Sequence, residues 1–90
     1  MSDMSKRSVF LDAVAENPAV VKYVQLFRMP LFLTVLDDEL KKYDDSVWEE
    51  ENSVRETAFK ALPVTLYQFS FPKEEIDKVI EQCVTEFVQK

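Results

Sequence analysis

Apolar residues recur at intervals of three and four along most of this chain, which is the spacing of one face of an α-helix. The pattern is clearest between Pro72 and about Val88, where the proline also suits the first position of a helix. It consists of Ile76, Val79, Ile80, Cys83, Val84, Phe87 and Val88. We therefore predict a helix over 72–88, with Cys83 buried as a small hydrophobic residue.

A second segment, Met29–Leu36, is apolar on every side of a helix rather than on one face. Such a segment is typical of a helix that is buried on most sides. We expect this helix to run from Pro30 to about Tyr43, because proline disrupts a preceding helix and suits the start of a new one. The helix at the end of the chain is expected to pack against Pro30–Leu40.

The first third of the chain contains two helix boundaries. Ser5 precedes an apolar face and is a good N-cap for a helix that continues to about Glu16. Asn17-Pro18 ends that helix and starts the next one, because asparagine is a good N-cap and proline fits the first helical position. The second helix is expected to end before Pro30. Residues 1–4 are expected to be frayed.

The start of the next helix is ambiguous, because two capping boxes compete, Ser46-x-x-Glu49 and Ser53-x-x-Glu56. A start at Ser46 places Glu51 inside an apolar arc, which is costly for a carboxylate without a partner. This cost argues that Val47–Asn52 is a separate turn. In either case we expect the helix to end just before Pro63.

Segment 64–71 has no clear helical face. Its β-branched and aromatic residues favour a strand, but a single strand has nothing to pair with. A short helix, a packed connector and a lone strand therefore all remain open. With this exception the patterns predict an all-α fold, a compact bundle of four to five short helices in a single domain of residues 1–90.

The chain contains no glycine and no histidine. Without glycine it lacks the dinucleotide-binding fingerprint, the P-loop and the nucleophile elbow. Without histidine it lacks histidine-based triads, HExxH zinc sites and carboxylate–histidine di-iron sites. We therefore expect no enzyme, no catalytic residue, no cofactor and no metal site.

The net charge of −6 is distributed unevenly along the chain. Residues 31–60 carry about −5, while residues 1–30 carry about +1, and no basic stripe suggests a nucleic-acid partner. Polar residues and a proline interrupt the apolar stretch Ala19–Leu36, so we expect no membrane span. A single cysteine fits a reducing compartment, and we expect a cytoplasmic location.

The negative charge is concentrated between Asp37 and Glu51, where eight of fifteen residues are carboxylates. Aromatic residues beside charges are common interface anchors. The expected partner-binding residues are Asp37, Asp38, Tyr43, Asp44, Asp45, Trp48, Glu49 and Glu50. Our leading hypothesis is a non-catalytic regulator, inhibitor or adaptor that binds a protein with a basic surface. A sharper form of this hypothesis is that the acidic run imitates nucleic-acid phosphates.

The apolar content, 47% without any glycine, is generous for ninety residues and favours a homodimer. Its expected interface lies in segment 64–71 and consists of Leu66, Tyr67, Phe69 and Phe71. The alternative function is a helix-turn-helix DNA-binding regulator that uses the basic residues of 1–30. A third hypothesis is an enzyme that works through carboxylates and a divalent metal.

Overall fold

The computed structural model describes residues 5–89, so the expected fraying of residues 1–4 lies outside the described residues. Within this range the chain consists of helices joined by short turns and contains no strand. Its elements are α1 (Lys6–Glu16), α2 (Pro18–Val24), the 3₁₀ turn η1 (Leu26–Arg28), α3 (Met29–Leu40), the 3₁₀ turn η2 (Asp45–Trp48), α4 (Glu51–Gln68) and α5 (Lys73–Gln89). The prediction of an all-α bundle of four to five helices is confirmed.

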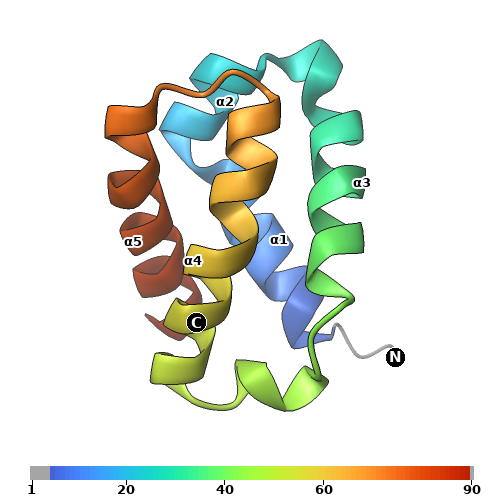
Figure 1. Cartoon of the computed structure of the whole chain (residues 1–90), viewed down its shortest axis with the longest axis vertical. Helices are drawn as coiled ribbons and strands as arrows, with labels where there is room; N and C mark the ends of the chain where they lie inside the picture. The colour runs from blue at the N-terminus through green and yellow to red at the C-terminus, as the bar shows by residue number, and fades with distance from the viewer. Residues whose placement is uncertain (1–4, 90) are drawn as a thin grey trace.

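The four longest helices surround one core. Figure 1 shows α4 in front and α1 behind, with α3 on one side of them and α5 on the other. Helix α5 packs mainly against α4 and α1, and α3 packs mainly against the same two helices. The expectation that the last helix packs on Pro30–Leu40 is therefore wrong, because α3 and α5 lie on opposite sides of the bundle.

Helix boundaries at the N-terminal side follow the capping chemistry. The Ser5 hydroxyl accepts a hydrogen bond from the Ser8 N–H at 3.2 Å and begins α1. The Asn17 side-chain oxygen accepts from the N–H groups of Ala19 and Val20, and Pro18 is the first residue of α2. Both predicted caps are confirmed. The second cap, at Asn17-Pro18, lies where the chain turns from α1 into α2.

Neither predicted capping serine starts α4, which begins at Glu51. A separate turn does precede it, as expected, but this turn spans Asp45–Trp48 rather than Val47–Asn52. The Asp44 carboxylate caps the turn by accepting from the Ser46 N–H at 2.9 Å. The turn is tied to Asp44 because aspartate readily bonds to the backbone two residues onward.

Pro63 does not end α4, which continues through it to Gln68. A Schellman motif ends the helix instead: the Phe71 N–H donates to the Leu66 carbonyl, and the Ser70 N–H donates to the Tyr67 carbonyl. Ser70 has a φ of 62°, a left-handed conformation that usually falls to glycine. Of the three alternatives for segment 64–71, the helix is therefore correct, as an extension of α4.

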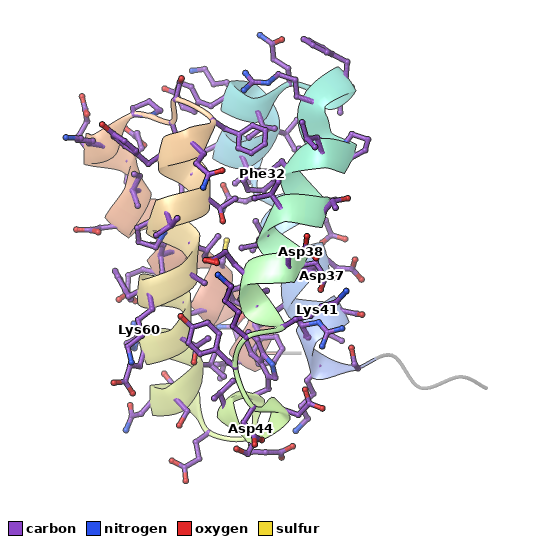
Figure 2. All side chains as sticks on the ribbon, turned by 45° about the vertical axis from the view of Figure 1, so that its right-hand side comes forward. Phe32, Asp37, Asp38, Lys41, Asp44 and Lys60 are labelled. Carbon is purple, nitrogen blue, oxygen red and sulfur yellow. The ribbon has the colours of Figure 1, made fainter. Side chains whose placement is uncertain are left out.

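The segment Met29–Leu36 is buried on one side only, so the expectation of burial on most sides is wrong. Phe32 and Leu36 are fully buried, but Leu31 is 60% exposed. Figure 2 shows Phe32 near one end of the bundle, with Asp37, Asp38 and Lys41 following along α3 toward Asp44 at the other end. Helix α3 therefore connects an apolar end of the molecule to an acidic end.

None of the helices in the described range is by itself long and apolar enough to cross a membrane. By length and composition alone, α2 and the segment Leu26–Leu40 together would be long and apolar enough, but the two are bent by 88°. The bend lies at Gln25, whose φ of 68° is in the left-handed region. Among residues 5–89 this is the second residue, beside Ser70, with a positive φ.

Candidate functional site

The acidic end of the bundle is formed by η2, the start of α1, the start of α4 and the end of α5. These elements enclose a cleft of about 660 Å³. Its lining combines one lysine, four carboxylates and an apolar floor: Lys6, Val9, Asp12, Trp48, Glu49, Glu50, Glu51, Val54, Phe87 and Val88. The cleft thus joins residues from both termini of the chain to the acidic run in its middle.

Trp48 forms part of the wall of this cleft and is only 3% exposed. Its ring lies 5.1 Å from the ring of Phe10 and 5.8 Å from that of Phe87, centroid to centroid. Trp48 is therefore buried in the free chain, because η2 turns the indole inward against α1 and α5. Its role in partner binding stays a prediction. Tyr43 is likewise half-buried and packs against the core.

The indole nitrogen of Trp48 is the one buried side-chain nitrogen or oxygen in residues 5–89 that has no hydrogen-bond partner. A buried donor without an acceptor loses its bond to water and gains nothing in return. Tryptophan nitrogens in protein interiors usually find a partner. Trp48 therefore combines a buried donor that has no partner with a place among the residues that line the acidic cleft.

Two of the predicted partner-binding carboxylates are already paired with cations from α1. The Arg7 guanidinium lies 2.8 Å from Asp37, which also pairs with Lys41 at 3.4 Å. The Lys6 ammonium lies 2.9 Å from Glu49, and both side chains are exposed. Asp37 is mostly covered and paired with two cations, and its role as a partner-binding residue stays a prediction.

The remaining predicted carboxylates are exposed at the acidic end. Asp38 is 70% exposed, and Lys41 approaches it only to 4.0 Å. Asp44 caps η2, and the hydrogen bond from the Ser46 N–H holds the pKa of its carboxyl below the ordinary value. Asp45 and Glu50 are exposed, and no cation in the described residues forms an ion pair with either. These side chains give the surface around the cleft its negative charge.

Helices α1 and α5 contribute residues to this site that were not predicted from the sequence. Asp12 and Val9 come from α1, and Phe87 and Val88 come from α5. Glu51 also lines the cleft. The Arg55 guanidinium lies 3.3 Å from the Glu51 carboxylate and also pairs with Glu81 on α5. Only the packing of α1 and α5 against η2 brings these residues together, so no local pattern in the sequence could have indicated them.

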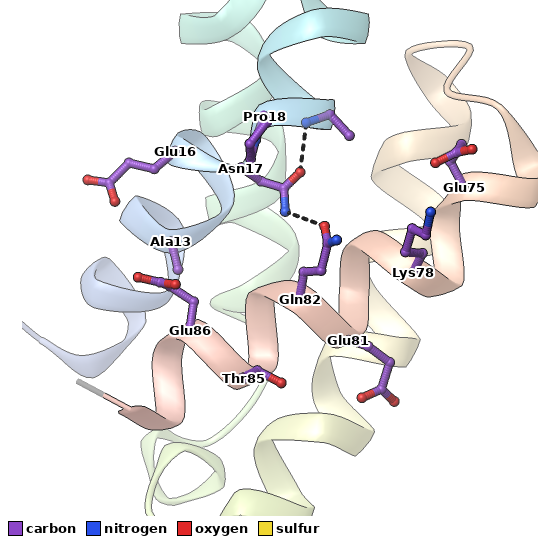
Figure 3. A pocket seen from close by; sticks show the side chains of 11 residues that line it. Ala13, Glu16, Asn17, Pro18, Glu75, Lys78, Glu81, Gln82, Thr85 and Glu86 are labelled. Atoms are coloured by element: carbon purple, nitrogen blue, oxygen red, sulfur yellow. Dashed lines mark hydrogen bonds between the residues drawn. The ribbon is translucent and has the colours of Figure 1, made fainter.

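A second cleft, of about 680 Å³, lies between the α1–α2 junction and α5 (Figure 3). The Asn17 amide nitrogen donates to the Gln82 side-chain oxygen at 3.0 Å, while the Asn17 oxygen caps α2. Among the described residues no buried polar side chain in its wall lacks a partner. The hydrogen bond between Asn17 and Gln82 therefore ties the α1–α2 junction to α5 in this cleft.

The opposite end of the molecule is apolar, and we call it the apolar end. Of the seven exposed large hydrophobic residues in the described range, it carries six, Val21, Leu26, Phe27, Leu31, Val64 and Tyr67. Three cations lie over aromatic rings there: Lys22 over Tyr23, Arg28 over Phe69 and Lys73 over Tyr67. No carboxylate occurs between Asn17 and Leu36 in the sequence.

The predicted dimer interface is wrong for three of its four residues. Leu66, Phe69 and Phe71 are buried within the chain, because the Schellman motif folds them under the end of α4. Only Tyr67 is exposed, at 62%.

The thiol of Cys83 lies in the core, as the sequence predicts. Burial raises its pKa to about 12, and the charge of Glu86 acts in the same direction. Within residues 5–89 no group of three or more histidine, cysteine, aspartate or glutamate side chains is placed to hold a metal ion.

The chain was compared with known proteins by sequence and by fold. No protein-family model matches it, and no curated protein and no solved structure is significantly similar to it. A function for the chain therefore has to be inferred from its own residues.

Proposed function

We propose that this protein is a non-catalytic interaction module that binds a basic partner protein through its acidic end. The observation that carries the proposal is the cleft between α1, η2, α4 and α5, whose wall combines four carboxylates with the unpartnered indole of Trp48. Carboxylates supply attraction at a distance, and the apolar floor supplies contact area. The protein would act as a regulator, an inhibitor or an adaptor.

The distribution of charge supports this choice of surface. Carboxylates surround the cleft, while the opposite end combines apolar side chains with three cations. A basic partner is therefore attracted to the surface around the cleft. Complementary charge of this kind accelerates and orients association more reliably than it adds affinity. The same surface could imitate a row of nucleic-acid phosphates for a partner that normally binds DNA or RNA.

The test starts with the tagged full chain as bait in an extract of the source cell, and mass spectrometry identifies the retained protein. Association with that protein is then measured by stopped flow for the double variant Asp44→Lys, Asp45→Lys. We expect an association rate at least tenfold lower and a weaker dependence on salt. The control variant, Glu74→Lys with Asp77→Lys, changes the net charge equally but lies on α5 away from the cleft, and it should associate like the wild type.

Two outcomes contradict the proposal. If both double variants slow association to the same degree, only net charge matters and the acidic end is not the binding surface. If the bait retains DNA and no protein, the helix-turn-helix alternative gains support. Against that alternative, the basic side chains of Lys6 and Arg7 are engaged with Glu49 and Asp37 rather than free to reach phosphates.

We further propose that two copies associate through the apolar end. The proposal is supported by Leu26 and Phe27, which are 75% and 79% exposed, and by Leu31 one turn farther along. A two-fold dimer brings the same patch together from both copies, so each supplies the apolar surface that the other needs. Sedimentation should give a dimer mass that falls to 10.5 kDa in Phe27→Glu but not in the control Val88→Glu. A monomeric wild type at tens of micromolar overturns this proposal.

A further inference from the structure

The cleft at the acidic end has three properties that together define a ligand class. Carboxylates line it, its floor is apolar, and one of its lining residues, Trp48, carries a buried hydrogen-bond donor without an acceptor. The first property calls for a cation, the second for an aliphatic or planar stem, and the third for a carbonyl oxygen. An arginine residue within a peptide offers all three.

The ion pair between Lys6 and Glu49 shows how a cation can sit at this cleft. Both residues line it, and the Lys6 ammonium lies 2.9 Å from the Glu49 carboxylate. More than half of each side chain is exposed, and exposed pairs of this kind contribute little to stability. An incoming cation can therefore replace Lys6 at Glu49 at small cost. In the free protein the Lys6 ammonium thus occupies the place at Glu49 that a cation of the partner would take.

A guanidinium fits these surroundings better than an ammonium. It is planar, it bonds to carboxylates through two parallel N–H groups, and it stacks on aromatic rings. The cleft offers Asp12, Glu49 and Glu50 as carboxylates and Phe87 as a half-buried ring. The indole N–H of Trp48 then takes a backbone carbonyl next to the arginine as its acceptor.

We propose that this cleft binds an arginine residue in a basic segment of the partner, with its guanidinium among Asp12, Glu49 and Glu50 and a neighbouring carbonyl on the Trp48 N–H. The inference rests on the proposed function, because it specifies what the acidic end recognises. The indole nitrogen is closed off from solvent in the free protein. Binding therefore requires a local rearrangement of side chains, and the Lys6–Glu49 pair is the contact that opens.

The single tryptophan makes the test specific to this site. In the ¹⁵N-labelled full chain it gives one indole N–H resonance. The probe is the peptide acetyl-Ala-Ala-Arg-Ala-Ala-amide, and the matched peptide carries citrulline, which has the same shape without the charge. The arginine peptide should shift the indole resonance in a saturable manner, and the citrulline peptide should bind at least tenfold more weakly.

Three variants examine the assignment. Glu50→Gln should weaken binding of the arginine peptide severalfold, and Lys6→Ala should strengthen it by freeing Glu49. Trp48→Phe keeps an aromatic ring but removes the donor, and it should weaken binding severalfold while circular dichroism shows an intact fold. Glu74→Gln, which removes the same charge outside the cleft, should leave binding unchanged.

The inference is overturned if the indole resonance stays in place while the arginine peptide saturates the protein. It is also overturned if citrulline binds equally well, or if folded Trp48→Phe binds like the wild type. These failures are distinct from failure of the proposed function. If the Asp44 and Asp45 reversals slow partner association but the indole does not respond, the acidic surface stands and the arginine site falls. If the indole responds but the reversals have no effect, the arginine site stands and the wider surface falls.

Discussion

The ring of Trp48 lies 5.1 Å from the ring of Phe10, and the two planes are tilted by 36°. This contact joins the short turn η2 to the first helix. It places the indole at the boundary between the core and the acidic cleft, where Phe87 completes the aromatic group. The position of the cleft wall therefore depends on the packing of Phe10.

Replacing Phe10 by alanine should remove this support. Phe10 is fully buried, and truncation of a buried phenylalanine costs about 3–5 kcal/mol of unfolding free energy. The fluorescence of Trp48 should shift to longer wavelength, because water reaches the indole. Chemical denaturation followed by fluorescence measures both effects. Val21→Ala, at a half-exposed position, should change the unfolding free energy by less than about 1 kcal/mol.

Ser70 offers a stabilising substitution. Its φ of 62° is a left-handed conformation that costs an L-residue about 1–2 kcal/mol. Ser70→Gly should therefore raise the unfolding free energy by roughly 1 kcal/mol, since the Schellman hydrogen bonds do not involve its side chain. Ser53→Gly, inside the first turns of α4, should lower it by a similar amount. Thermal melts of both variants measure the difference, and a destabilised Ser70→Gly contradicts the proposed strain.

Asn17 has two separable roles at the α1–α2 junction. Its oxygen caps α2, and its amide nitrogen bonds to Gln82 on α5. Asn17→Ala should cost about 1–2 kcal/mol, because both interactions are lost. Gln82→Ala removes only the contact with α5 and should cost about half as much. Equal losses in urea titrations would show that the cap contributes nothing of its own.

The Cys83 thiol predicts how stability depends on pH at the alkaline side. Burial raises its pKa from the ordinary 9.0 to about 12, so the unfolded chain releases this proton first as the pH rises. The protonated, buried thiol thus contributes to the unfolding free energy. This contribution is fully present below pH 9 and is lost as the pH rises toward 12. The loss has a slope of up to about 1.4 kcal/mol per pH unit.

Comparison with Cys83→Ala isolates this contribution. The stability difference between wild type and variant should shrink above pH 9, and it should be constant below that value. The folded wild type should also react slowly with a disulfide reagent at pH 8 and quickly in denaturant. Fast reaction of the folded protein contradicts the burial of the thiol.

The sequence showed many of the charged residues that belong to the candidate site, but it did not show how they are arranged in space. The acidic run and Trp48 are consecutive in the chain, so composition alone indicated them. The pairing of Asp37 with Arg7 depends on where α1 lies, and the inward position of Trp48 depends on Phe10 and Phe87. These contacts join segments far apart in sequence, which local patterns do not relate.

The helical class, the last helix and the turn at Asn17-Pro18 could all be predicted from local sequence. Periodicity and capping act over a few residues, so each of these features follows from neighbours in the chain. The continuation of α4 through Pro63 depends instead on packing between the helices. A proline costs a helix about 3 kcal/mol, but Leu66 and Phe69 become buried when the helix continues. Burial depends on the other helices, and it is the larger effect at the end of α4.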